Sequence, residues 1–151
     1  MMSAYFAFFH HIAAFALMTA LALELVLLNG ELSVLRAKQL MRVDLIYGTA
    51  AGLVLLIGLL RVFYFEKGSF YYFHNFYFHL KLGVFLLVGL PSIIPTMEFL
   101  SWRKIAAKGE LPVIAPKKLK LIKLIIHLEL LGIVVILFCA AQMAKGAGVI
   151  G

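Results

Sequence analysis

The chain has 151 residues, of which 64% are hydrophobic and only 14% charged, and its formal net charge is +7. An average soluble domain is about half apolar and about a quarter charged, so this composition excludes an ordinary soluble protein. With a mean hydropathy of +1.05, residues 1–151 are predicted to form one integral membrane domain with no soluble module.

Four apolar runs each reach the length of about 20 residues that a helix needs to cross a bilayer. No Lys or Arg precedes the first run, unlike a cleaved secretory signal, so we expect a retained helix. Pro91 and Pro95 should kink the third helix, and the Gly-rich tail after the fourth helix should fray. The sequence predicts an all-α, four-helix transmembrane bundle with spans at residues 4–28, 45–65, 76–99 and 121–143.

Basic residues gather in two connections, after the first and the third span. In a four-span protein these connections lie on one side, and the positive-inside rule places them in the cytoplasm, with both termini outside. We therefore expect a bacterial inner (cytoplasmic) membrane protein. Its partners should be membrane lipid, a redox partner and a second copy of the chain. Nucleic acid is not expected, because the basic run can instead bind anionic lipid headgroups at about 1 kcal/mol per Lys. The residues concerned are Arg36, Lys38, Arg42, Arg103, Lys104, Lys108, Lys117, Lys118, Lys120 and Lys123.

A glycine pair and a single cysteine within the spans are interpreted as residues that help helices to pack. Gly48 and Gly52 form a GxxxG spacing in the second helix, which favours a tight helix–helix seam; alternatively, the glycines leave room for a flat cofactor. Cys139 lies inside the fourth helix and is interpreted as a packing residue.

Nitrogen-bearing side chains concentrate near the predicted outer face. An ionisable residue inside a span indicates a functional site, and imidazole suits haem iron, copper and zinc. A His on the first helix facing a His on the third could clamp a haem iron. No C-x-x-C-H sequence is present, so haem b would be held without covalent attachment. This outer tier comprises His10, His11, Arg61, His74, His79, Lys81 and Gln142.

Half of the aromatic residues lie between positions 63 and 78, at the same end of the predicted bundle. They are typical of the aromatic belt at a membrane–water interface, and a porphyrin could also pack on them. Arg61, Lys67 and Lys81 are cations suited to porphyrin carboxylates, for which Arg offers a bidentate grip.

An inner tier of mostly acidic residues lies toward the predicted cytoplasmic face. It could bind a metal, relay protons or pair with the basic residues nearby, and ion pairing is the favoured interpretation. The Glu-x-x-His pattern of di-iron bundles is absent, and His127 and Glu129, two residues apart, should point in nearly opposite directions. This possible second site comprises Glu24, Asp44, Glu98, His127 and Glu129.

Two short motifs carry a resemblance: His11-Ile12 in the first helix and Phe-His-Leu-Lys-Leu at residues 78–82. They resemble the HemJ-type protoporphyrinogen oxidases, four-span bacterial membrane proteins that bind haem b. The resemblance implies functional roles for His11 and Lys81. The chain lacks the Pro-Arg segment that follows the first helix in those enzymes, so it is also similar to a related group of uncharacterised bacterial four-helix membrane proteins.

Together these patterns predict a haem b-binding protein that acts in electron transfer or in oxidoreduction of a lipophilic or porphyrin substrate. His11 and His79 are the predicted iron ligands, with His10 as a substitute for His11, and Lys81 and Arg61 are the predicted catalytic residues. Two other classes stay open. One is an ion, metal or proton transporter that uses the two tiers without haem, and the other is a structural subunit.

Overall fold

The computed structural model describes residues 2–65 and 69–150, and its elements are all helical. Four apolar stretches are long enough to span a membrane, at Met2–Asn29, Val34–Tyr64, Phe76–Ala107 and Pro116–Ala144. The predicted all-α fold with four membrane-length helices is confirmed. The elements are α1 (Met2–Asn29), α2 (Val34–Leu60), the π-helix η1 (Arg61–Phe65), α3 (Ser69–Phe73), α4 (Phe76–Gly89), α5 (Ile93–Ser101), α6 (Arg103–Ala107) and α7 (Pro116–Ala144).

The helix ends follow local sequence signals. Helix α2 begins at Val34, well before the predicted residue 45, because the Ser33 side chain accepts a hydrogen bond from the Arg36 N–H at 3.1 Å and caps the helix. Helix α7 begins at Pro116, where the missing N–H of proline costs nothing. The kink predicted from Pro91 and Pro95 is a break at Pro91, which falls between α4 and α5, whereas Pro95 lies in the first turn of α5.

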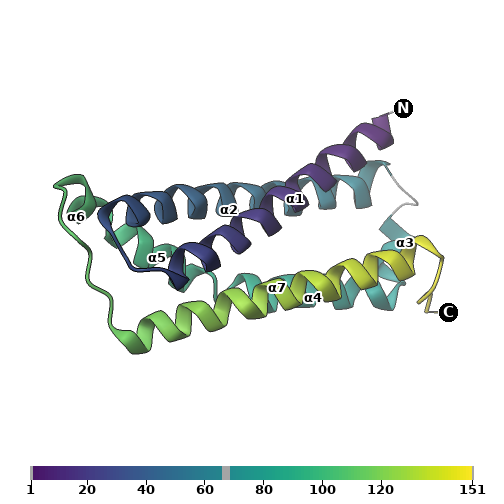
Figure 1. The fold of residues 1–151 in the computed structure, drawn as a ribbon. Coiled ribbons are helices and arrows are strands. Elements are labelled where there is room, and N and C mark those ends of the chain that lie inside the picture. Colours follow the sequence, from purple (N-terminus) through teal and green to yellow (C-terminus); the bar gives the residue numbers. More distant parts are fainter. Residues whose placement is uncertain (1, 66–68, 151) are drawn as a thin grey trace.

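The helices pack as two pairs. Helix α1 runs along α2 and α4 runs along α7, while α1 also contacts α7 and α2 contacts α5. Both termini lie at one end of the bundle, and the α1–α2 and α6–α7 connections lie at the opposite end (Figure 1). The two basic segments therefore share one end of the molecule, as a four-span chain requires.

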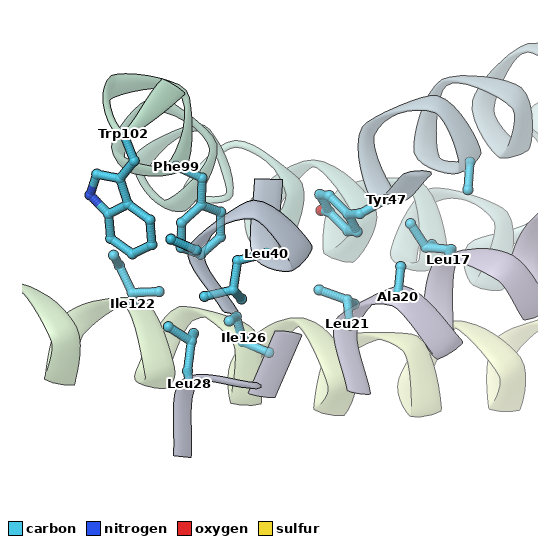
Figure 2. Packing of buried hydrophobic residues seen from close by; sticks show 12 residues of the cluster. Leu17, Ala20, Leu21, Leu28, Leu40, Tyr47, Phe99, Trp102, Ile122 and Ile126 are labelled. Atoms are coloured by element: carbon cyan, nitrogen blue, oxygen red, sulfur yellow. The ribbon is translucent and has the colours of Figure 1, made fainter. Parts of the chain in front are cut away.

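The largest apolar core lies between α1, α2, α5 and α7 (Figure 2). Phe99 and Trp102 are almost fully buried and meet edge to face, with ring centroids 5.2 Å apart. Ile122 and Ile126 of α7 and Leu40 of α2 are also inaccessible. This packing ties the four spans together at the end that carries the basic connections.

The C-terminal tail is held by hydrogen bonds, so the prediction that it frays is wrong for residues 145–150. Asn75 is fully buried, and its side-chain N–H donates to the Ala147 carbonyl at 2.9 Å. The Phe76 N–H donates to the Gly148 carbonyl, and the Ile150 N–H donates to the His74 carbonyl, each at 2.8 Å. The tail is thereby attached to the start of α4.

The GxxxG pair does not form a helix–helix seam. A Cβ added at Gly48 or Gly52 would meet no atom within 4 Å, so both glycines face outward and the predicted seam is wrong. Close approach occurs instead at Gly132 of α7, where an added Cβ would lie 2.9 and 3.0 Å from the Val88 methyl carbons of α4. Spacing alone indicated that small residues share a face, but not which face packs.

Candidate functional site

A cavity of about 590 Å³ lies at the end of the bundle that carries the termini. It is formed by α1, α2, η1, α3, α4 and α7, and its walls are mostly aliphatic and aromatic. Ligand sites in proteins occupy about 300–1,000 Å³ and combine apolar walls with a few polar groups. Here the polar groups are His10, His11, Arg61, Lys81 and the tyrosines Tyr71 and Tyr72.

The His11 ring is oriented by a backbone hydrogen bond. Its Nδ1 lies 2.6 Å from the Ala7 carbonyl oxygen, and because a carbonyl can only accept, Nδ1 must carry the proton. In the neutral ring Nε2 then has a free lone pair. The same contact to the carbonyl four residues earlier is made by His74 and His127, so it is a common helix geometry. Of these three, only His11 lines the cavity.

His10 packs more deeply against α2. Its ring lies close to Gly58, where an added Cβ would be 3.3 Å from the His10 Cε1. Its Nδ1 is buried and has no hydrogen-bond partner, a condition that is uncommon in folded proteins and calls for an explanation. Gly58 therefore provides the space for the imidazole, which the sequence motif at Gly48 and Gly52 did not indicate.

Two of the predicted cations, Arg61 and Lys81, complete the polar part of the cavity, and Lys67 lies outside the residues that the structure describes. Arg61 is the first residue of the π-helix η1, an element that often occurs at functional sites. The Lys81 ammonium lies over the Phe78 ring at 5.4 Å and over the Tyr72 ring at 5.9 Å from the centroids. These cation–π contacts hold the Lys81 ammonium at the wall of the cavity.

The structure places the two other outer-tier histidines outside this cavity. His74 stacks on Phe70 with ring centroids 4.0 Å apart. The His79 Nε2 lies 2.9 Å from the Phe73 carbonyl oxygen, so this nitrogen carries a proton. His11 lines the cavity and His79 does not. The predicted pair of iron ligands is thus not brought together.

No group of three or more His, Cys, Asp or Glu side chains within residues 2–65 and 69–150 is arranged to hold a metal ion. The cavity contributes two imidazoles from adjacent positions of one helix. Haem iron needs only an axial ligand or two from the protein. The donor set of the cavity thus fits haem better than it fits a bare metal ion.

The inner tier divides into two parts. Glu98 forms an ion pair with Lys118 and accepts a hydrogen bond from the Trp102 indole N–H at 3.0 Å, which confirms the predicted ion pairing for this residue. His127 is exposed and Glu129 is buried, as their spacing predicted. Glu24, Asp44 and Glu129 are buried in the interior of the bundle, and the predicted ion pairing is wrong for them, since none of the three pairs with Lys or Arg among the described residues.

Two hydroxyl groups that the sequence pattern did not indicate contact carboxyls of the inner tier. The Tyr47 hydroxyl donates to Glu129 Oε1 at 2.5 Å, and the Thr96 hydroxyl donates to Asp44 Oδ1 at 2.8 Å. Tyr47 follows Asp44 by three residues, a spacing that places both on one helix face, so it could have been found. Nothing in the sequence joins Thr96 to Asp44, which lie on different helices.

Comparison with known proteins identifies the family. A family model described as "Predicted membrane protein (DUF2214)" matches residues 2–148. The chain belongs to this family. It is a multi-pass membrane protein with four candidate spans, and the match does not extend to the HemJ-type oxidases. No curated protein matches the chain, and no solved structure does.

Proposed function

We propose that the cavity binds haem b without a covalent bond and that the protein acts in electron transfer or in oxidoreduction of a lipophilic or porphyrin substrate. The bacterial inner membrane is the proposed location. The observation that carries the proposal is a ligand-sized cavity of about 590 Å³ in which imidazoles and two cations converge among apolar walls. Haem, when bound, supplies one-electron chemistry that amino-acid side chains lack.

The residues of the chain have separate tasks in this proposal. The His11 Nε2 is the iron ligand, because the bond from Nδ1 to the Ala7 carbonyl fixes the ring and leaves Nε2 free. Arg61 and Lys81 hold the porphyrin carboxylates, for which Arg provides a bidentate grip. The aliphatic walls exclude water, and this shell tunes the potential of the iron.

A single protein imidazole is proposed, in place of the pair predicted from the sequence. His10 and His11 are adjacent on α1 and point about 100° apart, so they cannot bind opposite faces of one haem. His79 is engaged with the Phe73 carbonyl. Arg61 and Lys81 remain the proposed catalytic residues because both face the cavity.

Absorbance spectroscopy tests the proposal. The full chain is expressed with a haem precursor, purified in detergent and compared with the variants H11A, H10A and H79A. We expect wild-type protein to carry haem with the spectrum of a single-imidazole iron, and H11A to lose most of it. H79A should retain the wild-type content, as should the matched control H127A, because neither ring lines the cavity.

Two results would refute this assignment. Wild-type protein without haem after expression with the precursor would remove haem from the function altogether. Haem loss in H79A with normal content in H11A would place the ligand outside the cavity.

The second candidate, proton or ion transport without haem, is favoured by the buried carboxyl groups of the inner tier. It predicts proton or ion flux in proteoliposomes that contain the haem-free protein.

A further inference from the structure

Three carboxyl groups from three helices meet in the interior of the bundle. The exposed fractions are 1% for Glu24 of α1, 6% for Asp44 of α2 and 3% for Glu129 of α7. Asp44 and Glu129 both lie close enough to act electrostatically on Glu24, and Asp44 acts on Glu129 as well. Like charges at such proximity, away from water, are strongly unfavourable.

Within residues 2–65 and 69–150, none of the three carboxyls forms an ion pair with Lys or Arg. The groups that face them are hydroxyls, Tyr47 of α2 toward Glu129 and Thr96 of α5 toward Asp44. The nearby Glu98 is already paired with Lys118.

The hydroxyl donors are distributed unequally. Glu129 and Asp44 each accept a hydrogen bond, which stabilises negative charge on a carboxylate. Glu24 receives none, and its Oε1 is buried without any hydrogen-bond partner. Such an orphaned polar atom is uncommon in a native interior and calls for an explanation, and protonation would remove the negative charge that no donor stabilises here. A negative charge on Glu24 would therefore be the least stabilised of the three.

We propose that Glu24, Asp44 and Glu129 form a buried proton-binding site in which Glu24 holds the proton at neutral pH. The inference stands independently of haem, because it rests on the inner carboxyls alone. The bound ligand is a proton, since the three groups are not arranged as a metal site in the described part of the chain.

The site lies directly beneath the cavity. Leu17 of α1 lines the cavity, and Glu24 follows seven residues later, which is about 10 Å along a helix. Ile133 of α7 also lines it, and Glu129 precedes Ile133 by one helical turn, about 6 Å. The proton-binding site therefore lies within about two helical turns of the cavity.

Infrared spectroscopy of the full chain in detergent at pH 7 tests the proposal. A protonated carboxylic acid gives a C=O band distinct from that of a carboxylate, and the band shifts in D₂O. We expect the wild-type protein to show this band and E24Q to lose most of it. The matched control is E110Q, which removes an exposed carboxyl and should leave the band unchanged.

Further variants keep the test decisive if E24Q does not fold. In wild-type protein the band must then shift with ¹³C-labelled glutamate and survive in E129Q and D44N. Absence of the band at pH 7, or a band unchanged in E24Q, would overturn the proposal. A rise in thermal stability with Na⁺ or Ca²⁺ that E24Q abolishes would overturn it too, because it would show a cation in place of the proton. Haem content in E24Q should stay at the wild-type level, which separates this test from that of the proposed function.

Discussion

Replacing Gly132 with Ala tests how closely α4 and α7 approach. The new Cβ would lie 2.9 and 3.0 Å from the two Val88 methyl carbons and 3.4 Å from Val84. Val88 is β-branched and stiff at χ1, so it cannot rotate away, and the helices must separate. Overpacking of this kind costs about 1–3 kcal/mol, against about 1 kcal/mol gained because Ala favours the helix over Gly.

Gly52→Ala is the matched control, because its Cβ would meet nothing within 4 Å while the gain in helix propensity is the same. The free energy of unfolding of G132A should therefore fall about 1–3 kcal/mol below that of G52A. Thermal or SDS unfolding in detergent, followed by circular dichroism, measures the difference.

A second substitution separates the clash from other effects. Val88→Ala removes both methyl groups that meet the new Cβ, so G132A should be less destabilising in a V88A background than in the wild type. The double-mutant cycle gives this coupling directly. Equal stability of G132A and G52A, or additive effects of G132A and V88A, would refute the close packing of α4 on α7.

The remaining predictions concern the tail and the orientation. Asn75→Ala should release the C-terminal tail, because it removes the hydrogen bond to Ala147 together with the cap of α4. Hydrogen exchange of the backbone amides of residues 145–150 should then become faster. An unchanged exchange rate would show that the backbone hydrogen bonds alone hold the tail. Both termini should lie outside the cytoplasm, since the basic connections share the opposite end (Figure 1); a reporter fused after Gly151 that is active only in the cytoplasm would contradict this.

Hydropathy was sufficient to predict the four spans, because crossing a bilayer imposes a length and an apolar composition on each helix. The interruption at Pro91 was equally predictable, since proline in a helix interior removes a backbone donor. The early start of α2 was missed because its first turns are polar, and the signal there is the Ser33 cap. Hydropathy does not register caps.

The spans were predictable, but the direction in which a side chain points was not. His11 and His79 were both predicted to face a haem, yet only His11 lines the cavity. Gly48 and Gly52 have the right spacing and face outward. The direction in which a side chain points depends on the rotation of each helix about its own axis. Packing between helices sets this rotation, and the local sequence does not encode it.

The π-helix that follows α2 makes chain length at this turn as important as side-chain identity. A π-turn accommodates one residue more than an α-turn, and each residue of a helix contributes a rotation of about 100°. Deleting one residue between Val62 and Tyr64 would let the α-helix continue and would turn everything after the deletion by that angle. The aromatic side chains beyond Arg61 would then leave the bundle in another direction, so single-residue deletions should be tolerated less well here than conservative substitutions.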